Sequence, residues 1–356
     1  MASKLFMCFI IIVSILSCGD TTQQLNEHRS SQLQNIAEFG AQPLHQSFQN
    51  ACTQLASDVK LFAENLNADN LRKVQKQWKE VGQLFKRCEL YDIGDVNSSF
   101  IHFRIHRWPV NTARLQDTIQ QGEPLTLEKM SNFGSALVGI AALEYLLFDE
   151  DTDTTLSLFQ SEPRRVEYLN LATEYLAKQA TELNSIWKKY QPAFVAALEN
   201  EIAGGHNQMI NSLVDFLETT SKLRIGKALT AEAENGVDPK RLEAYRSNAS
   251  LDFIKSGFEE WKRCYGGAFA NSPDQFGFDD YLKALGQSDL ANRIQTAIKN
   301  CDVALTELSN LNQDLEAQTA QVTDLMNAFN QLSILMKTEL ATYLGVTVMV
   351  NDSDGD

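Results

Sequence analysis

The sequence predicts an all-α protein made of two helical-bundle domains, and three observations support this interpretation. Only 7 of the 356 residues are proline, against a usual fraction of about 5%, so few positions interrupt a helix. Strand-like alternation is scarce, and its best example is the short stretch VTVMV at residues 346–350. Apolar residues recur instead at helical spacing. Two long segments show this spacing: Leu71, Val74, Trp78, Val81, Phe85 and Cys88, and then Val322, Leu325, Phe329, Leu332, Met336, Leu340 and Tyr343.

The N-terminal segment predicts export. Lys4 precedes the apolar run LFMCFIIIVSILSC, which is typical of a signal peptide and too short to span a membrane. The run ends in ILSC, which resembles the bacterial lipobox. By that resemblance residues 1–17 are removed, Cys18 carries lipid, and Gly19 gives no signal for inner-membrane retention. We therefore expect an exported lipoprotein on the outer membrane, at its periplasmic face or at the cell surface; a plain secreted or single-span protein is the alternative.

The rest of the chain divides into a tether and two halves. Residues 18–34 are polar and predict a tether that merges into a first helix. Stretches rich in Gly, Pro, Asp and Asn then separate segments of bundle-helix length. One of them, AGGHN, begins at residue 203. We place an N-terminal helical-bundle domain at residues 35–203 and a C-terminal one at residues 204–356. Their similar sizes suggest a duplicated bundle, although no strict repeat is visible.

Charge and cysteine content narrow the function further. The chain has a formal charge of −15, whereas nucleic-acid-binding proteins carry a basic patch. No nucleic-acid partner is therefore expected. Four cysteines remain beyond the leader and the lipid anchor, and an exported protein permits disulfides. We predict that Cys52 pairs with Cys88 and that Cys264 pairs with Cys301, each pair closing a helix hairpin. The alternative is that all four are small apolar residues in helix cores.

One glutamate stands out for its surroundings. Glu144 is the only charged residue in the stretch 131–148, SNFGSALVGIAALEYLLF. A buried carboxylate without a partner is costly, so Glu144 reaches solvent, has a partner or belongs to a site. Residues three apart on a helix share a face, which is how a His-x-x-Glu pair binds metal in a helical bundle. The residue at that position is Ala141, which cannot ligate, so half of such a pair is missing.

This stretch resembles the signature of imelysin-like proteins (peptidase M75 type), which reads Gly-x-His-x-x-Glu followed by Tyr-Leu-Leu. Gly139 and Glu144 match the motif, and Ala141 stands where the family has histidine. Further segments are similar to the family in the same order, from about residue 40 to the end: residues 103–111 with a Trp-Pro pair, 221–229, 246–267 and 341–356. The resemblance implies two helical-bundle domains with a cleft near the motif, export, and a role in bacterial iron acquisition.

The function expected from this resemblance is a binding or accessory component of iron or haem uptake. Such a protein would associate with the membrane through its lipid and with other iron or haem uptake proteins. The family's metallopeptidase label gives one alternative, which Ala141 weakens, and a structural surface scaffold is another. No catalytic residue is assigned. No cofactor is certain, and iron, haem and zinc stay open as ligands.

The segment around residue 106 supplies further candidates for ligand binding or for pairing with Glu144. On a helix, His102 and His106 would share one face at a workable metal spacing; the alternative is that both are polar surface residues or only form hydrogen bonds. Arg104 and Arg107 could pair with Glu144, and Trp108 belongs to the same segment. We expect Glu144 to be partly buried in the cleft, with an arginine, a lysine or a ligand within hydrogen-bonding distance.

Overall fold

The structure is a computed structural model that describes residues 26–229, 236–270 and 272–349. Within these residues every regular element is a helix, which confirms the predicted all-α class. The first group of helices covers residues 26–196 and opens with a helix over residues 26–35. Its other members are η1 (Ile36–Ala41), α2 (Gln42–Glu64), α3 (Ala68–Cys88), η2 (Glu89–Tyr91), α4 (Gly94–Ser98), α5 (Ile101–Ile105), α6 (Thr112–Gln120), α7 (Leu127–Asn132), η3 (Ser135–Leu137), α8 (Gly139–Phe148), α9 (Thr152–Ser161) and α10 (Pro163–Ala196).

The second group of helices covers residues 205–344. Its members are α11 (Gly205–Glu218), η4 (Thr219–Gly226), α12 (Lys227–Leu229), η5 (Pro239–Arg241), α13 (Ser250–Gly266), α14 (Phe278–Ala284), α15 (Ser288–Thr306), α16 (Leu311–Ala317), α17 (Thr319–Ile334), η6 (Leu335–Leu340) and α18 (Ala341–Leu344). The connection from α10 to α11 contains the predicted boundary at residue 203. The division into two separate domains remains a prediction.

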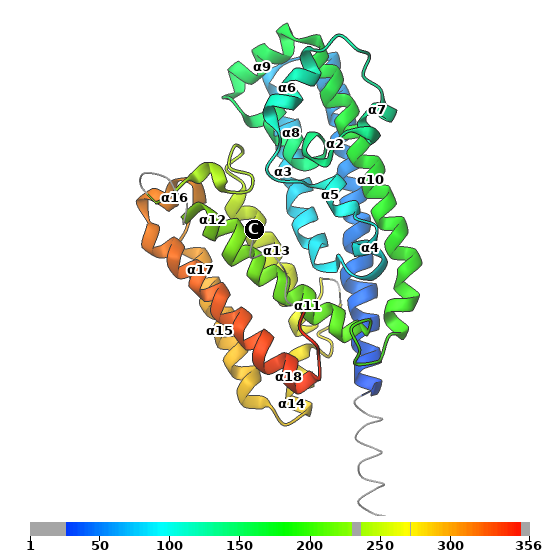
Figure 1. Cartoon of the computed structure of the whole chain (residues 1–356), viewed down its shortest axis with the longest axis vertical. Coiled ribbons are helices and arrows are strands. Elements are labelled where there is room, and N and C mark those ends of the chain that lie inside the picture. Colours follow the sequence, from blue (N-terminus) through cyan, green and yellow to red (C-terminus); the bar gives the residue numbers. More distant parts are fainter. Residues whose placement is uncertain (1–25, 230–235, 271, 350–356) are drawn as a thin grey trace, which may run out of the picture.

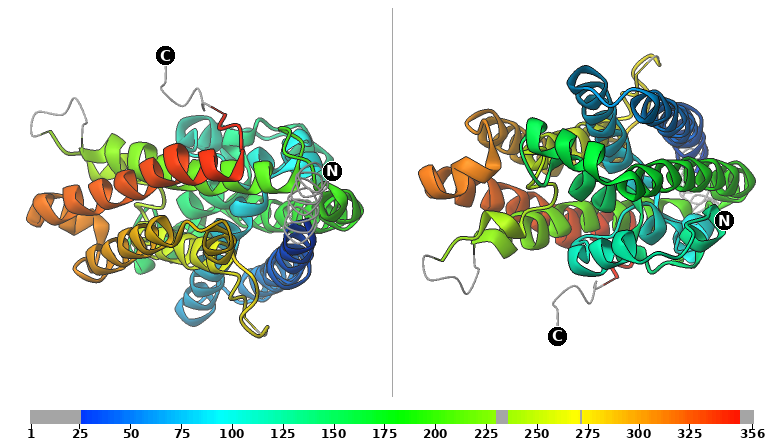
Figure 2. Two further views of the ribbon diagram at one scale, coloured as in Figure 1. Left: turned by 90° about the horizontal axis from the view of Figure 1, so that it is seen from below. Right: turned by 90° about the horizontal axis from the view of Figure 1, so that it is seen from above.

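The two groups lie side by side. In the first group α2 and α10 run alongside each other, as the side view and the end views show (Figures 1 and 2). The second group packs against the first mainly through α13, which lies on α3. These contacts leave the lower part of α10, together with α4 and α5, facing α11 across the molecule (Figure 1). The candidate site lies in that region.

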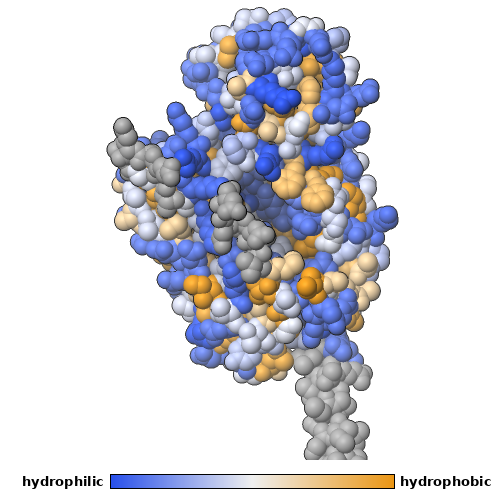
Figure 3. All heavy atoms as spheres, in the orientation of Figure 1, coloured by the Kyte–Doolittle hydropathy of each residue, from blue (hydrophilic) through white to orange (hydrophobic). Residues whose placement is uncertain are grey.

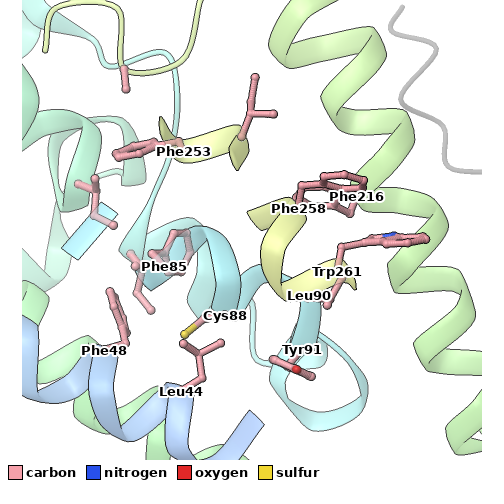
Figure 4. Close-up of a cluster of buried hydrophobic side chains, with 14 of the residues drawn as sticks. Leu44, Phe48, Phe85, Cys88, Leu90, Tyr91, Phe216, Phe253, Phe258 and Trp261 are labelled. Carbon is pink, nitrogen blue, oxygen red and sulfur yellow. The ribbon is translucent and has the colours of Figure 1, made fainter. Parts of the chain in front are cut away.

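A continuous hydrophobic core joins the two groups. Figure 4 shows Phe48 of α2 and Phe85 of α3 in one cluster of buried side chains with Phe253 and Trp261 of α13. All four side chains are buried. Because burial of large aromatic side chains dominates core energetics, the two groups stabilise each other through this shared core.

The first predicted apolar stripe is confirmed in full, since all six of its residues are buried. The second is confirmed up to Leu340, but Tyr343 is 48% exposed. The reason is the π-helix η6, which precedes α18. A π-helical turn contains an extra residue, so the helix after it is rotated relative to the 3.6-residue pattern.

Two further expectations differ from the structure. Residues 26–34, placed in the predicted tether, are helical, and Arg29, Gln32 and Leu33 among them are buried. Arg29 Nη1 donates to the Leu198 carbonyl at 2.5 Å, which holds this helix against the end of α10. The VTVMV stretch forms no strand over residues 346–349. No helix among the described residues has the length and apolar character needed to cross a membrane.

The predicted disulfides are absent from the structure. Cys52, Cys88, Cys264 and Cys301 are free thiols, and all four are buried. Burial raises the pKa of each thiol, which keeps it protonated and unreactive at neutral pH. They therefore act as small apolar residues in helix cores, the alternative that the sequence left open.

Candidate functional site

A cleft of about 1170 Å³ lies between the two groups of helices. Its walls come from the ends of α3 and α10, from α4 and α5, and from α11 and η4 of the second group. Figure 3 shows the hollow on the face seen in Figure 1, with hydrophilic side chains inside it and hydrophobic ones along its edge. A space of this size accommodates a small organic ligand.

Five charged or titratable side chains form the charged floor of the cleft: Lys86, Glu89, His106, Arg224 and Glu243. Lys86 Nζ lies 2.6 Å from Glu89 Oε1 and also contacts Glu243. Arg224 bonds Glu89 through Nη2 at 2.5 Å and Glu243 through Nε at 3.2 Å. His106 Nε2 lies 2.5 Å from Glu243 Oε1. The charged floor therefore links the two groups of helices, because Arg224 and Glu243 belong to the second.

The pKa shifts within the charged floor favour two charged carboxylates, a charged Arg224 guanidinium and a neutral imidazole. Burial alone would raise the pKa of Glu243, but the charges on Lys86 and Arg224 outweigh it and hold that pKa well below its ordinary value. The same two cations lower the pKa of Glu89 against the effect of burial. Burial, helped by the charge on Lys86, lowers the pKa of His106. At neutral pH the floor is therefore electrically balanced.

The edge of the cleft is apolar and exposed. Phe103 is 38% exposed, Ile202 54% and Met349 53%, and all three line the opening. The Phe103 ring lies 4.0 Å from the His102 ring and carries the Arg107 guanidinium 5.3 Å from its centre. A ligand in the cleft would therefore meet buried polar groups at the floor and exposed apolar side chains at the edge.

Two motif residues, Gly139 and Glu144, position parts of this site although neither lines the cleft. Gly139, the first residue of α8, has φ +79°, and a Cβ on it would lie 2.2 Å from the Ile105 carbonyl oxygen. A glycine is needed both for this backbone conformation and for the close approach. The contact fixes the end of α5, and the residue that follows it is His106, a member of the charged floor.

Glu144 bridges the two groups of helices, although it does not line the cleft. It is 3% exposed, and its Oε1 accepts hydrogen bonds from the backbone N–H and the hydroxyl of Ser247, each at 2.9 Å. Burial raises its pKa, while the Ser247 bonds and the nearby charge of Arg246 lower it. Glu144 therefore anchors the segment that follows Glu243 to the first group of helices.

The structure corrects three expectations about these residues. Glu144 was expected partly buried in the cleft, beside an arginine, a lysine or a ligand, but it is almost fully buried, does not line the cleft, and bonds Ser247. Arg104 instead donates to Tyr175 Oη and to the Ser131 carbonyl, and Arg107 lies over Phe103. His102 and His106 do not share a helical face, because α5 ends at Ile105 and His106 has extended backbone angles.

The two histidines therefore have separate surroundings. His102 Nδ1 lies 2.9 Å from Asp92 Oδ2, whereas His106 belongs to the charged floor. Both line the cleft, as do Arg107 and Trp108, and Ala141 is buried and does not. Among the described residues no group of three or more His, Cys, Asp and Glu side chains is placed to hold a metal ion. Structural zinc takes four protein ligands and catalytic zinc three. His102 and His106, with the carboxylates near them, therefore do not fit a zinc site.

Four of the five floor residues were not predicted from the sequence. Lys86 and Glu89 are three residues apart, an ordinary spacing for a helical ion pair that marks no site. Glu243 is distant in the chain from its partners Lys86 and His106. Arg224 lies inside the segment 221–229, whose resemblance to the family was the available signal.

Replacing Glu144 with leucine is expected to destabilise the fold by about 1–3 kcal/mol, because the buried N–H of Ser247 loses its acceptor. Glu144→Gln keeps an oxygen there and should cost less. Since the folded pKa of Glu144 is raised above its ordinary 4.5, its contribution to stability is present below that pH and is lost as the pH rises through the folded pKa. Urea unfolding at several pH values should therefore show that the free energy of unfolding of Glu144→Gln increases relative to that of the native protein as pH rises. Equal losses for both variants at every pH would contradict this role.

The sequence and the fold are similar to those of known proteins. The chain is 22% identical over 262 residues to iron-regulated protein A of Synechococcus elongatus, a match that covers 70% of this chain and 67% of the relative. The fold is similar to that of an imelysin-like protein from Psychrobacter arcticum, with a TM-score of 0.75, 18% identity, and coverage of 91% of this chain and 98% of the other.

A second crystal structure gives the same result. It is a putative iron-regulated protein A precursor from Parabacteroides distasonis, with a TM-score of 0.76, 16% identity, and coverage of 90% of this chain and 95% of the other. At these identities the structures establish the fold. The sequence model of the imelysin family (peptidase M75) matches residues 41–337. Because the match spans most of the sequence, the chain belongs to the imelysin family.

Proposed function

We propose that this protein is a non-enzymatic binding or accessory component of iron or haem uptake, exported and held at the outer membrane by lipid on Cys18. Cys18 lies outside the described residues. The observation that carries the proposal is the cleft of about 1170 Å³ with a buried charged floor and an exposed apolar edge. Apolar walls with a few fixed polar groups are typical of small-molecule sites. The iron-regulated proteins among the relatives support the choice of iron.

The same observations favour ligand binding over the two alternatives. A metallopeptidase needs ligands that hold zinc in a site with an open position. Here Ala141 replaces the motif histidine, and Glu144 bonds Ser247 behind the cleft. A scaffold that only holds partners has no need of a ligand-sized cleft with a balanced set of buried charges.

The proposal is tested by ligand content and by titration. Protein purified without chelators should contain iron or haem by elemental analysis and absorption spectroscopy, and the stripped protein should rebind haem. Phe103→Ala is expected to weaken haem binding about tenfold, because burying one aromatic ring against a ligand contributes on the order of 1–2 kcal/mol.

The matched control is Phe39→Ala. Phe39 has the same 38% exposure as Phe103 but lies in η1 and does not line the cleft. Haem binding that both variants weaken equally, or no binding of iron or haem by the native protein, would refute the proposal. Casein cleavage abolished by a chelator would favour the peptidase instead.

A further inference from the structure

The carboxylate of Glu243, which also contacts Lys86, orients His106 and Arg224 in the charged floor. Glu243 Oε1 bonds His106 Nε2 at 2.5 Å, and Glu243 Oε2 bonds Arg224 Nε at 3.2 Å. Glu89 holds Arg224 from a second direction through Nη2. Both side chains are more than nine-tenths buried, with exposures of 7% and 9%. Their positions are therefore fixed before any ligand arrives.

Each of these side chains keeps one nitrogen without a partner. Among the described residues neither Arg224 Nη1 nor His106 Nδ1 has a hydrogen-bond partner, and both atoms are buried. Such buried polar atoms are costly unless something satisfies them. Both residues line the cleft, so a ligand in the cleft can supply the missing partner.

We infer that the floor of the cleft is a carboxylate-binding subsite, in which Arg224 Nη1 and His106 Nδ1 donate to one carboxylate group of the ligand. The inference rests on the proposed function in one respect only: it says how an iron-bearing ligand would be recognised. Iron would enter as a complex whose organic part carries the carboxylate, such as haem, and not as a bare ion. Arginine suits this task because its planar guanidinium matches the geometry of a carboxylate.

The charge balance requires a proton to accompany the ligand. The floor holds the cations Lys86 and Arg224 against Glu89 and Glu243, and His106 is neutral because burial lowers its pKa. A carboxylate would leave the floor with one unbalanced negative charge. Protonation of the imidazole at Nδ1 removes that charge and converts Nδ1 from an acceptor into a donor. Binding should therefore take up a proton from solvent.

The surrounding charges favour a carboxylate over a phosphate dianion. Among the described residues that line the cleft, seven are acidic and three are Lys or Arg. The acidic ones are Glu89, Asp92, Asp95, Glu199, Asp215, Glu218 and Glu243. A monoanionic group adds the least negative charge to this lining, and one proton on His106 compensates it fully. The apolar edge at Phe103 then contacts the uncharged remainder of the ligand.

The test compares haem with its dimethyl ester, which keeps the iron and the ring and lacks free carboxylates. Calorimetry of the full chain should show haem binding at least tenfold tighter than the ester. Arg224→Gln should weaken haem at least tenfold and leave the ester unchanged. Haem affinity should fall as pH rises from about 6 to 8, by up to tenfold per unit, and His106→Gln should abolish that pH dependence.

Arg87→Gln is the matched control, because Arg87 also forms an ion pair between the two groups, with the buried Glu260 at 2.8 Å, and neither residue lines the cleft. It should leave the preference for haem over the ester intact. If Arg224→Gln does not fold, Arg224→Lys should still reduce that preference, because lysine keeps the charge but lacks the planar guanidinium. Haem and ester binding equally to the native protein would overturn the inference.

Simple anions separate this inference from the proposed function. Benzoate should bind the native protein in an Arg224-dependent manner and more tightly than inorganic phosphate. If benzoate binds in this way and no iron compound does, the proposed function fails and the subsite stands. If haem binds with no dependence on its carboxylates or on Arg224, the proposed function stands and the subsite is wrong.

Discussion

Replacing Glu243 with alanine is expected to reduce the free energy of unfolding by about 3–5 kcal/mol, because it leaves Lys86 and Arg224 buried with one remaining carboxylate between them. Lys86 is 1% exposed and Glu243 5%, so solvent cannot compensate for the lost partner. His106 also loses the acceptor of its Nε2 bond. Urea unfolding followed by circular dichroism measures the change.

The same carboxylate predicts a dependence on pH. The folded pKa of Glu243 lies well below its ordinary 4.5, so its stabilising effect is complete above that value and is lost as pH falls through the folded pKa. Stability of the native protein should therefore decline below about pH 4.5, and Glu243→Ala should decline less steeply.

The control for Glu243 is Glu339→Ala. Glu339 pairs with Arg293 at the surface, with exposures of 37% and 44%, where water and salt screen the interaction. A loss of stability as large as that of Glu243→Ala would show that charge removal alone, and not burial, causes the effect.

Replacing Gly139 with alanine is expected to destabilise the fold by roughly 2–5 kcal/mol, the sum of a strained left-handed backbone and an overpacked contact. The added Cβ would lie 2.2 Å from the Ile105 carbonyl oxygen, and a backbone atom cannot move aside as a flexible side chain does. Relief requires α8 and the end of α5 to separate. His106 would then shift, so ligand binding in the cleft should weaken together with stability. Thermal unfolding and haem titration of the variant measure the two effects.

Gly134→Ala is the matched control for Gly139. Gly134 lies five residues earlier in the chain and has φ −60°, and a Cβ on it would meet no atom within 4 Å. Alanine there should leave the melting temperature and binding almost unchanged. Comparable losses at both positions would show that the motif glycine has no special role in holding the site.

Local patterns in the sequence were sufficient to predict the helices. The hydrogen bonds of a helix join residues four apart, and the apolar spacing marks which face will be buried. The stripe from Leu71 to Cys88 is therefore correct at every position. The second stripe fails only at Tyr343, because nothing in its spacing indicates the π-helical turn before it. The motif also identified Gly139 and Glu144 as unusual, through a lone charge and a family resemblance.

The sequence by itself determined the all-α class, the family and the segments around the site. Only the tertiary structure decided which side chains meet there. His106 and Glu243 are 137 residues apart in the chain, and Glu144 and Ser247 are 103 apart, so no local pattern links them. Glu144 shows the difference most clearly: its position as a lone charge suggested an arginine, a lysine or a ligand as partner, whereas in the fold it bonds the backbone and hydroxyl of Ser247. Burial arises from the packing of many elements at once, and it alone determines which charges must be paired.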